Sequence, residues 1–432
     1  MAAPWLRRPV LAGLALSVLA MGTSTFTTLG LGALAPYLRS SFGLSTFEVG
    51  ALPALVFLGA VSVSVAAGKL TDRIGAGRAL ALSLSGVAVG IGFAAVAPNT
   101  IAFLIGVALG GVGYGAVNPA TNVLSTSLVP RSSRAFFLSI KQAGVTLGGL
   151  LAGAILPSLA DLMGWRQALI LPIACLLGCA VGALWAARRE RAGWFEAPGT
   201  VEGRVSLVQV AVPGATATAL FGFVSSGVQL SVAGYLTIYL VDTHNFSKPV
   251  AGVGLSVAFA AGCVGRLAWG AISDRVFSSS HATTLVISSI GSIIGLIALA
   301  AGVSGILLWP AIALVGFCSI GWNGVYMALI TDRAGDTSLG RATGRGLVFL
   351  YCGVVVVPPV LGALHDAVNS WTVVWSVATL AVLTAASLLA LGPRHLISIP
   401  SRELPPLGGP AGADLRLDPV STANAGARDG SW

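Results

Sequence analysis

Long apolar stretches are the feature that most constrains how this chain can fold. Windows of about 20 apolar residues, the length of a helix that crosses a lipid bilayer, recur along most of the sequence. Hydrophobic residues make up 55% of the chain and charged residues only 9%, with a mean hydropathy of +0.89, whereas about 25% of a soluble domain is charged. The sequence therefore predicts an all-α membrane protein with twelve transmembrane helices, at residues 10–38, 47–70, 78–97, 101–128, 136–159, 166–187, 210–240, 249–271, 283–303, 306–330, 345–365 and 371–391.

A short charged segment occurs twice, each time at the end of an apolar stretch. Residues 68–73 read Gly-Lys-Leu-Thr-Asp-Arg and residues 270–275 read Gly-Ala-Ile-Ser-Asp-Arg, an offset of 202 positions. The same offset carries the start of the first span to residue 212 and the end of the sixth to residue 389, close to where the seventh span starts and the twelfth ends. Parallel repeats of this kind are typical of secondary transporters. We expect a cytoplasmic N-terminus (1–9), two six-helix bundles (10–187 and 210–391), a cytoplasmic linker (188–209) and a disordered cytoplasmic tail (392–432).

Basic residues in the loops predict how the chain is oriented. With the N-terminus inside, only Arg39, Arg166 and Lys248 fall on the outer side, and the other loop arginines and lysines fall on the inner side. By the positive-inside rule, both termini and the linker are cytoplasmic. We therefore expect a multi-pass protein of the plasma membrane, or of the inner membrane if the source is bacterial. The same distribution accounts for the basic pI of about 9.8 without a nucleic-acid partner.

The small and the reactive residues fit this picture. Gly144, Gly148, Gly149 and Gly153 follow one another at spacings that predict close packing of membrane helices. The five cysteines lie in apolar stretches, and the four histidines lie in loops or at span ends. The sequence has no nucleophile-elbow serine and no glycine-rich phosphate loop. We expect no enzyme, no catalytic residue, no metal site and no cofactor.

The spans and the repeated loop together resemble a known family. The pattern Gly-x-Leu-x-Asp-Arg-x-Gly at residues 68–75, with a second copy at 270–275, resembles the loop of the major facilitator superfamily, and the resemblance covers residues 10–391. It implies two bundles that work by alternating access, with a close helix contact at the first glycine and a charge network that holds one access state closed. The gating residues that it implies are Gly68, Asp72, Arg73, Gly270, Asp274 and Arg275. The alternative is that both aspartates only shape turns.

Ionisable residues inside the spans point to the cargo, because a central charge costs roughly 2.5–3.5 kcal/mol on insertion scales. The sequence places no carboxylate deep in a span, which disfavours a pump for cationic drugs. Arg266 precedes Asp274 by eight residues and so lies about 12 Å deeper along the eighth span. The segment around Arg266 resembles the eighth helix of the oxalate:formate antiporter and monocarboxylate transporter families, which implies that Arg266 binds a substrate carboxylate. Alternatively, Arg266 pairs with another group inside the protein or serves in helix packing.

A second basic residue and several polar residues complete the candidate site. Lys141 follows Arg134 by seven residues, about 10 Å inside the fifth span, where it either contacts substrate or extends to the lipid headgroups. Polar residues of the fourth and tenth spans would face the same central cavity, or would only join helices. The predicted substrate-binding residues are Arg266, Lys141, Gln142, Asn118, Thr121, Asn122, Trp322, Asn323 and Tyr326.

These residues favour a permease for a small organic anion, a mono- or dicarboxylate, that is either secondary active or facilitative. The alternatives are an exporter of neutral or amphipathic compounds and a transporter-like membrane sensor. The expected partners are the small-molecule substrate and the lipid bilayer, without nucleic acid. A monomer is compatible with the sequence.

Overall fold

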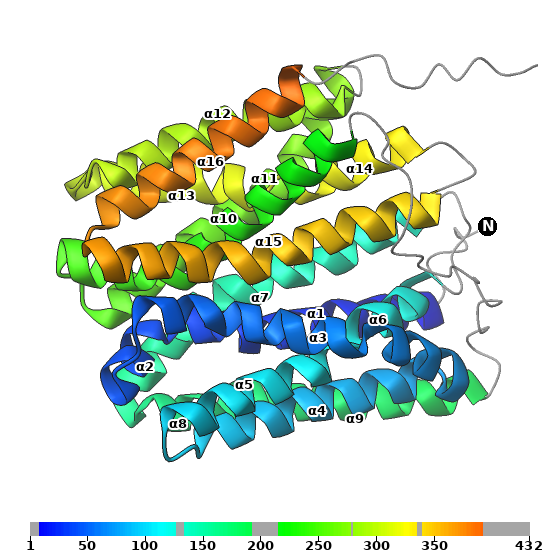
Figure 1. Ribbon diagram of the computed structural model, residues 1–432. Coiled ribbons are helices and arrows are strands. Elements are labelled where there is room, and N and C mark those ends of the chain that lie inside the picture. Colours follow the sequence, from blue (N-terminus) through cyan, green and yellow to red (C-terminus); the bar gives the residue numbers. More distant parts are fainter. Residues whose placement is uncertain (1–7, 127–133, 192–214, 278–279, 335–338, 392–432) are drawn as a thin grey trace, which may run out of the picture. The chain divides into compact units, whose positions relative to one another are not determined.

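The computed structural model describes residues 8–126, 134–191, 215–277, 280–334 and 339–391 (Figure 1). The chain falls into two compact units, Met1–Pro393 and Arg394–Trp432, and the second unit, with the predicted tail, lies outside the described residues. The elements of the first unit are α1 (Arg8–Ala33), α2 (Ala35–Phe42), α3 (Thr46–Ile74), α4 (Ala76–Ala95), α5 (Thr100–Tyr114), α6 (Val117–Thr126), α7 (Arg134–Met163), α8 (Trp165–Ala168), α9 (Ile170–Arg191), α10 (Ala215–His244), α11 (Lys248–Arg275), α12 (His281–Ala300), η3 (Gly305–Leu307), α13 (Leu308–Ser319), α14 (Asn323–Ala334), α15 (Leu339–Val368) and α16 (Trp371–Leu391).

The twelve predicted spans are confirmed. Twelve helical segments of the described residues are long and apolar enough to cross a membrane, from Val10–Ala33 to Trp371–Leu391. The structure differs from the sequence prediction inside the fourth and tenth spans, which are each broken into two helices. The breaks lie between Tyr114 and Val117 and between Ser319 and Asn323. Both breaks contain glycine, and the residues around them are apolar. Hydropathy alone therefore predicts one span for α5 and α6 and one for α13 and α14.

Side chains at the loops fix where several helices begin. Ser45 and Glu48 form a capping box at the start of α3, each bonding the backbone N–H of the other. Asn99 accepts a hydrogen bond from the Ala102 N–H at the start of α5. These local caps set the ends of α3 and α5 independently of the membrane.

Helices of the first six spans (the N-terminal half) pack mainly on one another, as do those of the last six (the C-terminal half). Within the halves, α1 packs on α7, α4 on α5 and α9, and α12 on α13 and α16. Between the halves, α7 crosses α11, α3 lies along α15 and α1 touches α10 (Figure 1). The division into two bundles joined by a linker stays a prediction, because residues 192–214 lie outside the described ranges.

The predicted glycine face of α7 makes close contacts, as expected. A Cβ atom on Gly144 or Gly148 would come within 2.5 Å of a backbone oxygen of α1. On the other side, a Cβ atom on Gly153 would lie 2.6 Å from the Gly252 oxygen, and one on Gly252 would lie 2.5 Å from the Gly153 oxygen. At these two glycines, α7 and α11 therefore meet backbone on backbone.

Candidate functional site

The buried Lys141 of α7 lies against α6, the helix that follows the break in the fourth span. Its ammonium nitrogen donates to Asn118 Oδ1 at 3.0 Å, to Thr121 Oγ1 at 3.3 Å and to Asn122 Oδ1 at 2.5 Å. Spacings of three and four residues put these acceptors on one face of α6, directly after the break. The Lys141 residue is only 1% exposed, so it does not extend to the lipid headgroups. The structure thus brings together four of the predicted site residues.

Arg266 of α11 lies at the boundary between the halves. Its Nη1 donates to the Gln142 carbonyl oxygen of α7 at 3.2 Å, and its Nε points to the Ile320 carbonyl oxygen at 3.4 Å, a weak contact. Ile320 lies in the break of the tenth span, between α13 and α14. Arg266 thus contacts the helix that carries Lys141 and Gln142, through the Gln142 backbone rather than its side-chain amide.

Lys141 and Arg266 share one electrostatic property. Among the residues that the structure describes, neither has a carboxylate within ion-pair distance. Lys141 fills its three N–H groups with neutral oxygens, which leaves its positive charge uncompensated. Arg266 donates two of its five N–H groups to backbone oxygens, which leaves three for other acceptors. One uncompensated cation thus comes from each half.

Three aromatic residues next to Lys141 escaped the sequence analysis. The Phe57 ring of α3 lies 5.5 Å from the Tyr351 ring of α15 and 6.2 Å from the Tyr114 ring of α5, measured between centroids. Tyr351 lies close enough to interact with the side chain of Asn118, which accepts from Lys141. This aromatic group, Phe57, Tyr114 and Tyr351, joins the two halves beside the lysine. An aromatic ring in an apolar span carries no sequence signal that separates it from the core.

The predicted residues of the tenth span lie in a different environment. Trp322 packs against Phe221 and Tyr326, with centroid distances of 5.8 and 5.2 Å, and donates to Gln229 Oε1 at 3.1 Å. Asn323 is partly exposed. The buried Tyr326 hydroxyl has no hydrogen-bond partner among the described residues. Trp322 also borders a narrow cavity of about 10 Å³ in the C-terminal half, together with Phe221, Ser225, Val228, Ser288, Ser289, Ser292, Cys318, Ser319 and Val382.

The predicted gating residues are accessible in this structure. Asp72, Arg73, Asp274 and Arg275 are exposed. A Cβ atom added to Gly68 or Gly270 would meet nothing within 4 Å, so the close contact implied at Gly68 is absent in this conformation. We call this end of the helices the Asp72 end. The proposed role of these residues in closing it stays a prediction.

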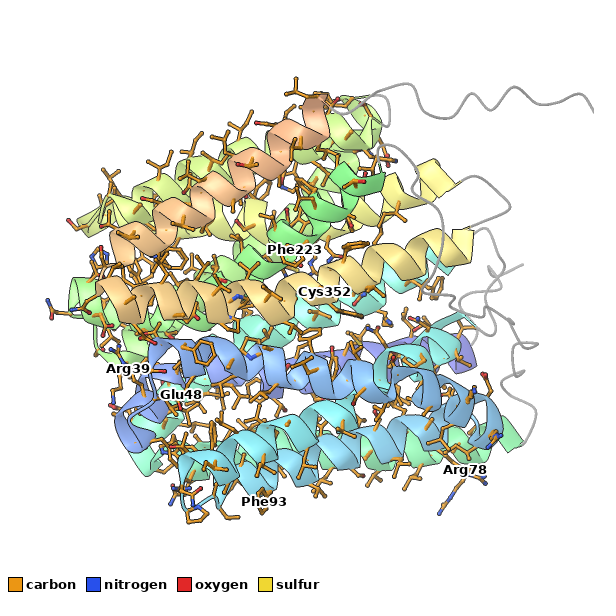
Figure 2. The ribbon with its side chains drawn as sticks, in the orientation of Figure 1. Arg39, Glu48, Arg78, Phe93, Phe223 and Cys352 are labelled. Carbon is orange, nitrogen blue, oxygen red and sulfur yellow. The ribbon has the colours of Figure 1, made fainter. Side chains whose placement is uncertain are left out.

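The opposite end, which we call the Arg39 end, holds contacts between the halves (Figure 2). Arg39 Nη1 lies 2.7 Å from Asp242 Oδ2. The Asp366 carboxylate accepts from the backbone N–H groups of Thr46 and Phe47 at 2.9 and 2.8 Å, at the first turn of α3. Farther in, the Thr237 hydroxyl donates to the Gly32 carbonyl oxygen at 2.8 Å.

Tyr37 lies at the Arg39 end outside the spans and supports these contacts. Burial, together with the nearby Asp161 carboxylate, raises the pKa of the Tyr37 hydroxyl. The hydroxyl therefore stays protonated and donates to the Pro157 carbonyl oxygen at 2.8 Å. The Lys248 ammonium of the other half lies 4.4 Å from the centre of the Tyr37 ring.

Comparison with known proteins agrees with this architecture. The sequence matches the Major Facilitator Superfamily over residues 14–347, and the chain belongs to this family. The nucleoside transporter NupG, solved as a mutant, has the same fold, with a TM-score of 0.70 at 13% identity over 88% of this chain and 99% of the NupG chain. The protein is thus a multi-pass membrane transporter by family and fold.

Three relatives with similar sequences are bacterial transporters. An uncharacterized MFS-type transporter of Mycobacterium tuberculosis is 24% identical over 406 residues, which cover 91% of this chain and 86% of the relative. The gentisate transporter of Corynebacterium glutamicum is 30% identical over 139 residues, 31% of each chain. The gallate transporter of Pseudomonas putida is 27% identical over 150 residues, 34% of this chain and 33% of the relative.

Proposed function

We propose that this transporter moves a small organic anion across the membrane by alternating access. The observation that carries the proposal is the pair of cations, Lys141 and Arg266, which come from opposite halves and have no carboxylate partner among the described residues. Placing two such charges within spans is unfavourable unless an anion compensates them for part of the cycle. A substrate carboxylate supplies that compensation.

The two cations would contribute differently. Arg266 keeps three N–H groups beyond its two backbone contacts, and its planar guanidinium suits two-point binding of a carboxylate. Lys141 would attract the anion through its charge, because its own hydrogen bonds are already made within the N-terminal half. Arg266 is therefore the direct ligand in this proposal, and Lys141 provides the positive potential.

Within the organic anions, aromatic acids are the class to test first. The aromatic group next to Lys141 presents three rings, against which a flat substrate can stack. Two relatives are named for aromatic acids, gentisate and gallate, although each is similar to only about a third of this chain. A carboxylate on Arg266 with its ring against Phe57, Tyr114 or Tyr351 is the arrangement that we propose.

Uptake into proteoliposomes tests the proposal. Radiolabelled gentisate should enter vesicles that contain the wild-type protein, and unlabelled gentisate should compete while its uncharged amide should not. The Arg266→Gln variant should lower uptake at least about tenfold, since it removes a charge-assisted contact. Succinate, which has carboxylates but no aromatic ring, serves as a second competitor. Its competition separates a requirement for the ring from a requirement for the carboxylate.

A matched control removes a cation elsewhere. Lys69→Gln neutralises an exposed charge outside the spans, so its uptake should equal that of the wild type. Size-exclusion profiles and thermal unfolding establish that each variant is folded. Competition by the amide as strong as by the acid, or unchanged uptake in a folded Arg266→Gln variant, would contradict the anionic substrate.

A further inference from the structure

An open pocket of about 200 Å³ lies at the Asp72 end of the N-terminal half, away from Lys141. It is lined by Arg78 of α4 and by Leu184, Ala187 and Arg188 of α9. Figure 2 labels Arg78 at the edge of the helices, at the end opposite to Arg39. Two guanidinium groups thus border a pocket whose remaining walls are aliphatic.

Close contact between the two helix backbones creates this pocket. A Cβ atom on Gly77 would lie 2.6 Å from the Ala187 nitrogen and 2.8 Å from the Ala183 oxygen, so α4 begins directly against the last turns of α9. Arg78, the next residue, is thereby held beside Arg188. The geometry of the pocket depends on this crossing rather than on a flexible loop.

The two arginines of the pocket, Arg78 and Arg188, have no acidic partner among the residues that the structure describes. The neighbouring Arg189 lies over the Trp185 ring, with its guanidinium carbon 5.2 Å from the centroid. Three arginines therefore gather where α9 ends, with an amphipathic indole ring of the kind found at membrane interfaces.

The surface next to the pocket is apolar. Val181, Leu184 and Trp185 on α9 are 67%, 50% and 48% exposed. In a protein that crosses a membrane, such exposed side chains face the acyl chains of lipids. The positive-inside rule predicts this end to face the cytoplasm, where anionic lipids attract clustered basic residues.

From this arrangement we propose that the pocket binds the headgroup phosphate of an anionic glycerophospholipid. Arg78 and Arg188 contact the phosphate oxygens, and the aliphatic wall of Leu184 and Ala187 accommodates the glycerol and the first acyl carbons. A soluble anion would use the two arginines but not the apolar surface beside them. The expected ligand is therefore a lipid and not free phosphate.

Lipid retention by the purified full-length protein tests the site. Native mass spectrometry after addition of phosphatidylglycerol should show more bound lipid than after addition of phosphatidylcholine. Arg78→Gln and Arg188→Gln should each lower the apparent affinity for phosphatidylglycerol about fivefold, the effect expected for one basic residue near an anionic surface. Lys69→Gln, at the same end but outside the pocket, should retain the wild-type affinity.

Thermal unfolding gives a second readout, in which inorganic phosphate is compared with phosphatidylglycerol. Phosphatidylglycerol should raise the melting temperature of the wild type more than that of the double variant Arg78→Gln/Arg188→Gln, because a ligand stabilises only the form that binds it. Inorganic phosphate alone should have no comparable effect. Equal protection by phosphate, equal lipid retention in the pocket variants, or the same loss in Lys69→Gln would each overturn the lipid site.

Discussion

The two ends of the boundary between the halves are built differently. At the Arg39 end, an ion pair, a carboxylate on a helix N-terminus and a hydroxyl–carbonyl bond connect the halves. At the Asp72 end, the four charged gating residues are exposed, and the two glycines beside them have open space where a side chain would begin. The polar contacts between the halves that the structure describes are thus concentrated at one end.

This difference indicates which state of the transport cycle the structure represents. A transporter that works by alternating access must close one end while the other opens. The contacts at the Arg39 end join the halves there, and the residues proposed to close the Asp72 end make no such contact with the other residues that the structure describes. The comparison therefore predicts opposite effects of substitutions at the two ends.

The largest effect is expected from Asp366→Asn at the Arg39 end. The substitution removes the negative charge that accepts two backbone N–H groups at the start of α3. Hydrogen bonds to charged groups contribute about 1.5–3 kcal/mol, so the population open at this end should rise about tenfold or more. Double electron–electron resonance measures this population through the distance between spin labels at the exposed residues Val96 and Ile306, in a background without cysteines.

Glu48 provides the matched control for Asp366. Its carboxylate also accepts a backbone N–H at the start of α3, but that bond, to Ser45, stays within the N-terminal half. Glu48→Gln should therefore weaken the helix start without changing the label distances. Equal shifts in the Asp366 and Glu48 variants would mean that the contact with Asp366 does not hold the halves together.

An intermediate effect of opposite sign is expected from Asp72→Asn. If Asp72 closes its own end in the other state, its loss disfavours the state that is open at the Arg39 end. In the Asp366→Asn background, the added substitution should lower that population up to about fivefold, as expected for a partly exposed charge at a helix terminus. A further rise on adding Asp72→Asn would contradict the assignment of Asp72 to the gate.

The smallest effect is expected from Arg39→Gln. Its ion pair with Asp242 is short, but the two side chains are 37% and 32% exposed, and such pairs contribute about 0.2–1 kcal/mol. The open population should rise about twofold, and the difference from wild type should shrink at high salt. A double-mutant cycle with Asp242→Asn isolates the pair, and a coupling as large as the Asp366 effect would reverse the ranking.

Sequence reasoning predicted the number of spans and the family because both depend on apolar length and on a local motif. It did not predict the breaks in the fourth and tenth spans. Residues 115–116 and 320–322 are apolar or small, so hydropathy does not distinguish a broken helix from a continuous one. The two breaks matter because Lys141 contacts the helix that follows the first, and Arg266 reaches a carbonyl oxygen in the second.

For the candidate site, charge and spacing were informative and aromatic identity was not. A lysine inside a span requires polar partners, and Asn118, Thr121 and Asn122 lie on one helix face, so their grouping could be expected. Tyr351 could not be assigned, since its contact with Asn118 joins residues that are far apart in the chain. Trp322 lies with Phe221 among the residues that border a cavity in the C-terminal half, and its contact with substrate stays a prediction.

The glycine contact between α7 and α11 has a consequence for how the halves move. At Gly153 and Gly252 bare main chain meets main chain, while the Ser256 hydroxyl of α11 donates to the Leu150 carbonyl oxygen of α7 at 2.8 Å beside them. A methyl group at either glycine would force the two helices apart. Any rearrangement of the halves that keeps this crossing intact must therefore preserve its short interhelical spacing.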